Sequence, residues 1–369
     1  MEQLRLKKLQ EHIKQESAWF AFLTSKENVF YLTGLLANPH ERLIALFVLE
    51  DDFYLVIPKM EQEVVRDAGY TGELVTYSDH ENVWDIIKNR LKKTSSHSST
   101  KVLIEQRTVS YERVLELGKL SDSLEFADCE PVMMEQRLIK TESELETLQR
   151  AAAFADAGVE FGINALRTGI TELEVIAEIE YQLKKQGIRE MSFQTTVLFG
   201  DHAASPHGKP GDRALQEGEF VLFDLGVVLN GYCSDITRTV AYGEVTDQAK
   251  AIYEVVLDAQ TAALHAAKPG IIIGDLDLTA RTIIAEAGFE DYFPHRLGHG
   301  LGIDVHEAPS MSQANKDILQ LGMTFTIEPG IYVPAVAGVR IEDDVVVTED
   351  GGVPLTIFPK TLLTIPPTP

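Results

Sequence analysis

The chain has 369 residues, of which 44% are hydrophobic and 24% charged, and this composition is typical of a globular protein. Its 57 acidic residues outnumber the 33 basic ones, and the resulting net charge of −24 makes nucleic acid and anionic membrane surfaces poor candidates as partners. No apolar run approaches the roughly 18 residues of a membrane span, and two cysteines are too few for a disulfide framework. We therefore expect a soluble cytoplasmic protein with two domains.

The first 130 residues alternate apolar runs with helical patterns, which predicts an α/β domain over residues 1–130. A helix is predicted between residues 81 and 93, because apolar side chains recur there at helical spacing. The strands that we expect in this domain lie at 18–24, 28–33, 43–49, 53–57 and 101–105.

The second domain, over residues 131–369, begins with the first of two predicted helix pairs. Thr141 with Glu144, and Thr171 with Glu174, have the spacing of a capping box, so each threonine is predicted to open a helix. A second pair is predicted about a hundred residues later, and strands that carry acids follow both pairs. This similarity indicates an internal duplication, although chance resemblance between helix–glycine–helix units explains the pattern equally well at this point.

Two aspartates lie in a predicted β-hairpin. An apolar strand that carries Asp224 leads into Asn-Gly at 230–231, the strongest short signal for a hairpin turn. If those two residues form the turn, Asp224 pairs with Thr237, and Asp235 pairs with Gly226. Both aspartates then lie on one face as diagonal neighbours, about 7–8 Å apart. Acids in such surroundings repel each other unless they are protonated or bind a cation, so the hairpin predicts a cation site.

The same pattern recurs nearer the C-terminus, which weakens the alternative that one aspartate caps a loop and the other is solvated. One apolar strand ends in Glu328, and a returning strand carries Glu342. Three of the ten histidines, His295, His299 and His306, lie between the two hairpins, while the HExxH spacing of zinc proteases is absent. Four acids in two hairpins, with a histidine nearby, predict an oxygen-rich site for a divalent metal with one imidazole ligand.

Together these motifs resemble the metallopeptidases of the pita-bread fold. The matching segments are DLG at Asp224, GYCSDITRT around Asp235, GHGLGIDVHE from residue 298, EPGIY at Glu328 and VRIED around Glu342. Within that family they are most similar to the proline-specific members, Xaa-Pro dipeptidase (prolidase) and aminopeptidase P. The resemblance covers essentially the whole chain. It implies an α/β (α+β) architecture, in which a creatinase-like N-terminal domain precedes a pita-bread catalytic domain with pseudo-twofold symmetry.

The resemblance also implies a role for each matching residue. The ligands that it implies for two divalent ions per subunit are Asp224, Asp235, His299, Glu328 and Glu342. Manganese is the expected ion, with cobalt or zinc as alternatives. His207 and His306 match residues that contact substrate and stabilise the tetrahedral intermediate, while His295 and Arg340 match residues that line the pocket or support it. A hydroxide that bridges the ions would attack the scissile carbonyl, with Glu328 as the proton shuttle.

The substrate that the resemblance implies is an Xaa-Pro dipeptide or short peptide, whose tertiary amide lacks the N–H that ordinary peptidases need. Some prolidases carry an arginine soon after VHE, and the residues after His306 include none. A dipeptidase then needs another anchor for the terminal carboxylate, or the enzyme takes longer peptides. We expect His40 or Arg42 to reach a substrate site, either in the same subunit or in the partner's across a homodimer. Alternatively, the segment that contains His40 and Arg42 is a solvated loop.

Other functions compete with the dipeptidase. Aminopeptidase P removes the N-terminal residue of longer Xaa-Pro peptides, but VHE and the short N-terminal domain favour the dipeptidase. Methionine aminopeptidase shares the catalytic fold, and the full N-terminal domain argues against it. Creatinase-like enzymes lack the metal-binding set. A non-catalytic binding module on the same fold would be expected to lose metal ligands, and all five are present here.

Overall fold

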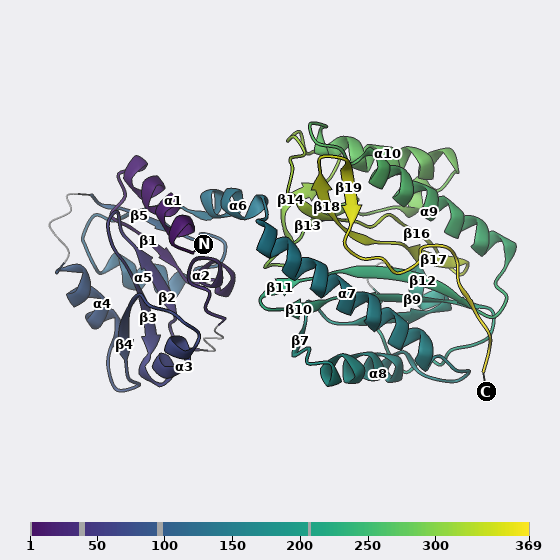
Figure 1. Cartoon of the computed structure of the whole chain (residues 1–369), viewed down its shortest axis with the longest axis horizontal. Coiled ribbons are helices and arrows are strands. Elements are labelled where there is room, and N and C mark those ends of the chain that lie inside the picture. Colours follow the sequence, from purple (N-terminus) through teal and green to yellow (C-terminus); the bar gives the residue numbers. More distant parts are fainter. Residues whose placement is uncertain (1, 37–40, 94–98, 206–207, 369) are drawn as a thin grey trace. The chain divides into compact units, whose positions relative to one another are not determined.

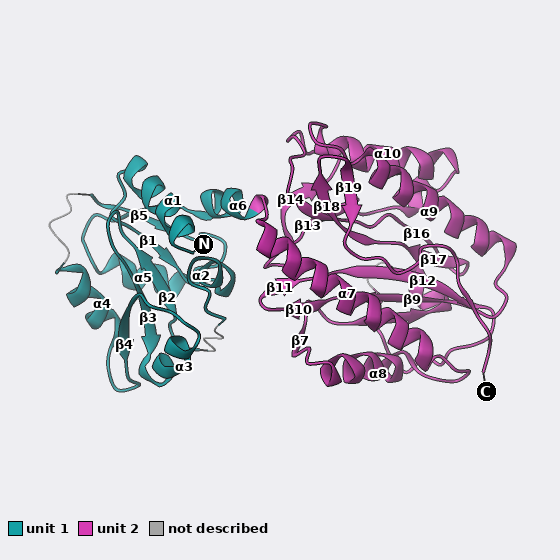
Figure 2. Ribbon diagram, in the orientation of Figure 1, with its two compact units in different colours: residues 1–137 teal, residues 138–369 magenta. Residues whose placement is uncertain are grey.

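A computed structural model describes residues 2–36, 41–93, 99–205 and 208–368 (Figure 1). The chain divides into two compact units, Met1–Arg137 and Leu138–Pro369 (Figure 2). The boundary predicted at residue 130 coincides with the first residue of helix α6 (Glu130–Leu138), and the contacts place the division at the end of that helix. Among the described residues, no helix combines the length and the apolar character that crossing a bilayer requires.

The first unit is built on one six-stranded mixed sheet with the strand order β4-β3-β2-β1-β5-β6. Its elements before α6 are α1 (Glu2–Gln15), β1 (Phe20–Leu23), α2 (Lys26–Thr33), β2 (Ala45–Val48), β3 (Phe53–Pro58), η1 (Lys59–Glu61), α3 (Gln62–Asp67), β4 (Glu73–Tyr77), α4 (Val83–Leu91), β5 (Lys101–Ile104), α5 (Tyr111–Gly118) and β6 (Glu125–Asp128). The central strand β1 pairs antiparallel with β2 and parallel with β5. Helices supply the crossovers that parallel pairs require, so the α/β prediction for this region is confirmed.

The segment predicted as the second strand is a helix, α2, so that prediction is wrong. The hydroxyl of Ser25 caps the helix by accepting a hydrogen bond from the backbone N of Asn28 at 3.2 Å, and Gly34 ends it in the left-handed conformation with φ of 74°. The buried carboxylate of Glu105 accepts hydrogen bonds from the backbone N of Ser25 (2.9 Å) and from the Asn28 amide (2.8 Å). Caps at both ends therefore outweigh the β propensity of the apolar run.

The described residues of the second unit form four sheets and four long helices. Its elements are α7 (Glu142–Ala165), α8 (Glu172–Lys185), β7 (Glu190–Met191), β8 (Thr196–Phe199), η2 (Gly200–Ala204), β9 (Glu219–Leu225), β10 (Val227–Leu229), β11 (Tyr232–Cys233), β12 (Ile236–Tyr242), α9 (Asp247–Ala266), α10 (Ile273–Glu286), η3 (Glu290–Tyr292), β13 (Gly298–Gly300), β14 (Glu307–Met311), β15 (Thr324–Ile327), β16 (Gly330–Val333), β17 (Ala337–Arg340), β18 (Asp343–Thr348), β19 (Gly351–Pro354) and β20 (Thr364–Ile365). The two larger sheets have the orders β20-β12-β9-β8 and β14-β13-β15-β18-β19. In the view of Figure 1, α9 and α10 lie above the strands, α7 crosses in front of them and α8 lies below.

The two halves of this unit repeat one another in detail. After α7, Gly169 N donates to Leu215 O, and after α9, Gly270 N donates to Leu319 O, in both cases at 2.9 Å. Both glycines have positive φ, 85° and 90°, which lets the chain turn between the helices of each pair. The four-stranded sheet follows the first pair and the five-stranded sheet follows the second. The structure therefore supports duplication over chance similarity, and the pseudo-twofold arrangement of the pita-bread fold is present.

Side chains and main chain join the two larger sheets along one line, which we call the seam and define as residues 235–239 and 340–344. Glu342 N donates to Thr237 O at 3.0 Å, and Thr239 Oγ1 donates to Arg340 O at 3.0 Å. The seam lies where the acid-bearing strands of the two halves meet, so it brings the predicted metal ligands of both hairpins together.

Candidate active site

The first hairpin has the register that its sequence predicts. Asp224 in β9 lies opposite Thr237 in β12, and the two turn residues have φ of 50° and 85°, as a type I′ turn requires. At Gly226, the partner expected for Asp235, an added Cβ would lie 1.8 Å from Ser234 O. Only glycine at position 226 therefore allows the two strands of the hairpin to approach this closely beside Asp235.

The second pair of acid-bearing strands also forms, but the predicted returning strand is split into β17 and β18, Glu342 lies between these two strands, and the β16–β17 hairpin separates β15 from β18 in sequence. Glu328 directly follows β15 and Glu342 directly precedes β18, and these strands pair antiparallel with Ile327 opposite Asp343. The two glutamates therefore sit at the same end of the strand pair. His299 lies in β13, which pairs with β15 in the same sheet. All five predicted ligands thus come from strand ends that meet near the seam.

The predicted ligands line one cavity of about 590 Å³. The ligand atoms of Asp235, His299 and Glu342 lie within 4.8 Å of one another. His299 Nε2 is 3.3 Å from Glu328 Oε1 and 3.7 Å from Asp235 Oδ2. Asp224 borders the same cavity, so the structure brings together the five side chains that the sequence singles out.

The His299 ring directs a lone pair, not a proton, towards the carboxylates. Its Nδ1 lies 3.2 Å from Gly300 O, which only accepts, so Nδ1 carries the proton and Nε2 does not. Burial lowers the pKa of His299 to about 3, with His306 adding to the effect, so the ring is neutral. Among the described residues, Asp235 Oδ1 and Glu342 Oε1 are also buried without a hydrogen-bond partner. Lone pairs that converge in this way fit a bound cation.

The acids of the cavity have raised pKa values. Burial, reinforced by neighbouring acids, raises the pKa of Asp235 and of Glu342 well above the usual range. Burial also raises the pKa of Glu328 to about 7. At Asp224 the burial effect raises the pKa but is opposed by the Arg340 guanidinium. The raised pKa values favour protonation of these acids when no cation is bound, whereas two divalent ions would formally neutralise four carboxylates and suit their hard oxygens.

A further buried acid, Asp344, supports Asp235. Its Oδ2 accepts a hydrogen bond from the backbone N of Asp235 at 2.9 Å. Asp344 follows Glu342 by two residues at the start of β18, so this bond ties the two ligand-bearing strands to each other across the seam.

A directed chain of hydrogen bonds runs from Asp224 to the cavity wall. Arg340 only donates, and its Nη2 bonds to Asp224 Oδ2 while its Nη1 bonds to the Tyr332 hydroxyl at 2.8 Å. That hydroxyl in turn donates to His295 Nε2, 2.9 Å away, because His295 Nδ1 lies 2.8 Å from the Arg296 carbonyl and carries the ring proton. Arg340 and His295 both line the cavity, and both take part in this chain of hydrogen bonds.

His306 also lies at the cavity, with its ring against that of His299 at a centroid separation of 4.2 Å. Burial, and then the nearby Arg296, lower the pKa of His306, which favours a neutral ring. The next residue, Glu307, is fixed by an ion pair with Lys140, whose Nζ is 2.6 Å from Glu307 Oε1. This ion pair anchors the segment that carries His306.

The remaining predicted substrate residues are His40, His207 and Arg42. His40 and His207 lie outside the described residues. Arg42 belongs to the first unit, where its Nε and Nη2 donate to the Asp79 carboxylate at 3.0 and 3.1 Å. Its Nη1 donates to Glu41 at 2.9 Å.

Two polar residues of the cavity, Tyr332 and Arg296, were not predicted from the sequence. Tyr332 lies in the EPGIY motif, but its link to Arg340 depends on the β16–β17 hairpin, which the sequence reasoning did not resolve. Arg296 directly follows His295 and is the only lysine or arginine between Arg281 and Lys316, a signal that was available. In the part of the chain that the structure describes, its guanidinium forms no ion pair and donates one hydrogen bond, to Ser310 Oγ at 3.1 Å.

An α/β unit followed by a duplicated unit with an acid-lined cavity is the architecture of a metallopeptidase. The sequence profile of Metallopeptidase family M24 matches residues 146–349, and that of the Creatinase/Prolidase N-terminal domain matches residues 5–139. The chain belongs to metallopeptidase family M24.

Individual relatives agree with this assignment. The chain is 53% identical over 360 residues to the Bacillus subtilis protein named "Putative dipeptidase YkvY", covering 97% of this chain and 99% of the relative. A prolidase from Thermococcus sibiricus superposes with a TM-score of 0.92 at 36% identity, covering 99% of each chain. An X-Pro aminopeptidase from Thermotoga maritima superposes with a TM-score of 0.85 at 28% identity, covering 95% of this chain and 99% of that one. The protein is therefore a peptidase, a hydrolase of a family that uses divalent metal.

Proposed function

We propose that this protein is a dinuclear, metal-dependent Xaa-Pro dipeptidase. The observation that carries the proposal is Arg296, which lines the same cavity as the acids and, among the described residues, is paired with no carboxylate. In a dipeptide the terminal carboxylate lies one residue beyond the scissile bond, so it must bind close to the metal ligands. A guanidinium binds a carboxylate through two parallel hydrogen bonds. Arg296 thus offers the anchor that is missing from the residues after His306.

The chain's own side chains would hold the metal. The proposed ligands of two divalent ions are Asp224, Asp235, His299, Glu328 and Glu342. When bound, such ions supply a Lewis acid for the scissile carbonyl and lower the pKa of the attacking water. Carboxylates with one imidazole accept manganese, cobalt or zinc, and manganese is our first choice.

The other steps rest on proton transfer and orientation by the protein. Glu328, which lines the cavity directly after β15, is suited to take a proton from the attacking water and deliver it to the proline nitrogen as the C–N bond breaks. The ring of His306, exposed at the cavity, is suited to donate a hydrogen bond to the oxygen of the tetrahedral intermediate. We propose the same task for His207, which lies outside the described residues.

A substrate comparison tests this proposal. Ala-Pro, its amide and Ala-Pro-Ala are assayed with the unmodified enzyme and with Arg296→Met. Because a charge-assisted hydrogen bond contributes about 1.5–3 kcal/mol, the variant should raise KM for Ala-Pro by about 10- to 100-fold and leave the amide nearly unchanged. Arg167→Met, which removes an arginine away from the cavity, is the matched control. Preference of the unmodified enzyme for Ala-Pro-Ala would contradict the dipeptidase and indicate aminopeptidase P.

We also propose that His40 or Arg42 contacts substrate in a homodimer, in the same subunit's site or the partner's. For Arg42 this requires exchanging its bonds to Asp79 for bonds to the ligand, which the partly exposed side chain allows. Arg42→Ala should then raise KM for Xaa-Pro dipeptides. An unchanged KM would rule Arg42 out of substrate binding.

A further inference from the structure

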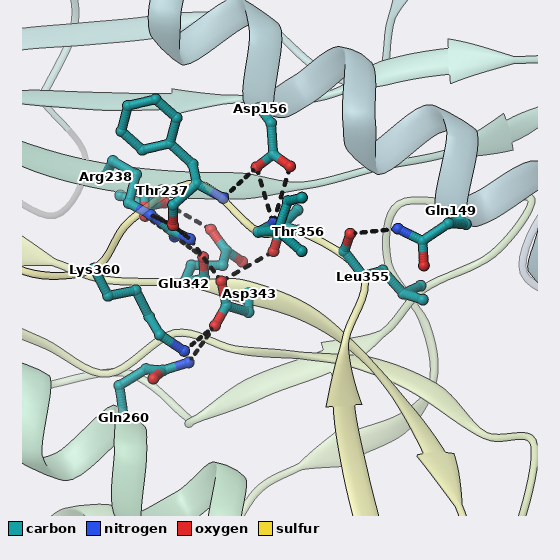
Figure 3. Close-up of polar contacts among 12 residues, drawn as sticks. Gln149, Asp156, Thr237, Arg238, Gln260, Glu342, Asp343, Leu355, Thr356 and Lys360 are labelled. Carbon is teal, nitrogen blue, oxygen red and sulfur yellow. Dashed lines mark hydrogen bonds and ion pairs between the residues drawn. The ribbon is translucent and has the colours of Figure 1, made fainter.

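A buried polar cluster lies behind Glu342 and is centred on the next residue, Asp343, which is 0% exposed (Figure 3). Asp343 Oδ1 accepts hydrogen bonds from Arg238 Nη2 at 2.7 Å and from Thr356 Oγ1 at 3.0 Å. Its Oδ2 accepts from Lys360 Nζ at 2.5 Å and from Gln260 Nε2 at 2.9 Å. Every lone pair of the carboxylate is therefore used. None of these five belongs to the described residues that line the cavity, so the cluster touches no substrate there.

The cluster holds the main-chain carbonyl of Glu342 through Arg238, and Thr237, which Arg238 also contacts, holds the Glu342 N–H and one carboxylate oxygen. Arg238 Nη1 donates to Glu342 O and, at 3.0 Å, to Thr237 O. Glu342 N donates to Thr237 O at 3.0 Å, and Thr237 Oγ1 donates to Glu342 Oε2 at 2.6 Å. The other carboxylate oxygen, Oε1, is the one buried without a partner among the described residues. Three of the four polar groups of Glu342 are thus fixed, and the fourth is left for a ligand.

A segment near the C-terminus completes the cluster, and we call residues 355–360 the strap. Helix α7 holds the strap through Gln149, which donates to a strap carbonyl at 2.8 Å, and through Asp156, which accepts from two strap N–H groups at 2.9 and 3.0 Å. The Phe358 carbonyl of the strap accepts a hydrogen bond from Arg238 Nη2 at 2.7 Å, and the strap also contributes Lys360 to the cluster. Figure 3 shows the strap residues between α7 and the cluster. Helix α7, which is about two hundred residues from the strap in sequence, therefore helps to fix the cluster.

The position of the cluster relates it to the spacing of the proposed ligands. Arg238 lies in β12 of the four-stranded sheet, whose hairpin carries Asp224 and Asp235, whereas Asp343 begins β18 of the five-stranded sheet. The Arg238–Asp343 ion pair, 2.7 Å long, thus cross-links the two halves at the seam. A small slide of one sheet against the other would change the distance between ligands from the two halves. Ligand geometry of this kind governs metal affinity.

We propose that Arg238 and Lys360 are positioning residues for metal binding, which act by fixing Glu342 and the spacing of the two ligand sets. This inference rests on the proposed function, in that Glu342 is taken as a metal ligand. Stability alone does not explain the cluster, because well-packed apolar residues replace buried ion pairs at little or no cost in many proteins. Outer contacts to metal ligands, by contrast, change metal affinity by about 10- to 100-fold.

The experiment measures Mn²⁺ affinity of the full-length, metal-free protein by competition with a fluorescent chelator, together with thermal unfolding with and without Mn²⁺. Lys360→Met removes one cation, and Arg238→Lys keeps the charge but replaces by a single ammonium the two guanidinium nitrogens that bond to Glu342 O and to Asp343. Lys360→Arg tests rescue. Lys250→Met, which removes a lysine from an exposed 3.0 Å ion pair, is the matched control.

We expect the first two variants to fold and to bind Mn²⁺ at least tenfold more weakly, with a smaller Mn²⁺-induced rise in melting temperature. The rescue and control variants should stay within twofold of the unmodified protein. If Arg238→Lys does not fold, Lys360→Met decides alone. Mn²⁺ affinity within twofold for Lys360→Met, even with a lower melting temperature, would overturn this inference and leave the proposed function intact. If the unmodified protein bound no Mn²⁺, both would fall.

Discussion

Glu328→Gln tests the electrostatics of the cavity most sharply, because it removes one ionisable group and keeps its size. Burial raises the pKa of Glu328 from 4.5 to about 7 in the folded, metal-free protein, whereas the unfolded chain keeps the ordinary value. Between those two pH values the folded state holds a proton that the unfolded state has lost. The stabilisation from that proton is fully present below pH 4.5 and is lost as pH rises through 7.

The size of the effect follows from the same pKa. A rise from 4.5 to about 7 corresponds to about 3 kcal/mol of unfolding free energy. The quantity to follow is the unfolding free energy of Glu328→Gln minus that of the unmodified protein. This difference should be about 3 kcal/mol larger at pH 8 than at low pH. Subtraction at each pH cancels the groups whose pKa values do not depend on Glu328. Glu342, whose pKa is raised in part by Glu328, adds a contribution of the same sign, because its pKa is raised less in the variant.

The assay is urea unfolding of both proteins, metal-free, at several values between about pH 4.5 and 8. With saturating Mn²⁺ the sign should reverse, because a neutral amide is a poorer ligand than a carboxylate and the variant gains less from the metal. A stability difference that does not change with pH in the metal-free proteins would refute the reasoning.

Three further predictions concern the same unit. Gly226→Ala should lower the unfolding free energy by about 3 kcal/mol or more in urea unfolding, because its Cβ would lie 1.8 Å from Ser234 O, and a loss below about 1 kcal/mol would contradict that geometry. Tyr332→Phe, which removes the hydroxyl next to His295, should lower kcat/KM for Ala-Pro about tenfold with an unchanged circular dichroism spectrum, and full activity would argue against the hydrogen-bond chain. Mn²⁺ affinity should rise between pH 6 and 8, because the raised pKa of acids such as Glu342 means that Mn²⁺ binding must release protons. Calorimetry in buffers of different ionisation enthalpy measures this release, and a binding enthalpy that is the same in all buffers would contradict the prediction.

Local signals explain what could be predicted from the sequence. The Asn-Gly turn fixes the register of the first hairpin, so the pairing of Asp224 with Thr237 follows from counting. The capping boxes at Thr141 and Thr171 mark helices that the structure contains. In each of these cases the deciding residues lie within about fifteen positions of one another, so the pattern is visible in the printed sequence.

Long-range contacts explain what could not. The helix α2 depends on Glu105, which lies 80 positions from Ser25 and contacts it only in the folded sheet. In the sequence, Asp343 belongs to the same motif as Glu342. Its partners, however, come from a strand about a hundred residues earlier and from the strap. Arg296 was visible as a lone cation, but its place at the cavity depends on how the segment after η3 folds.

The central claim is that the chain hydrolyses Xaa-Pro dipeptides with two divalent ions. The most direct test is a titration of the chelated enzyme with Mn²⁺, Co²⁺ or Zn²⁺, in which hydrolysis of Ala-Pro and bound metal are measured in the same samples. We predict no hydrolysis without metal and full activity when two ions are bound per chain. Hydrolysis of Ala-Pro by the metal-free enzyme, or no hydrolysis with any of the three ions bound, would contradict the claim.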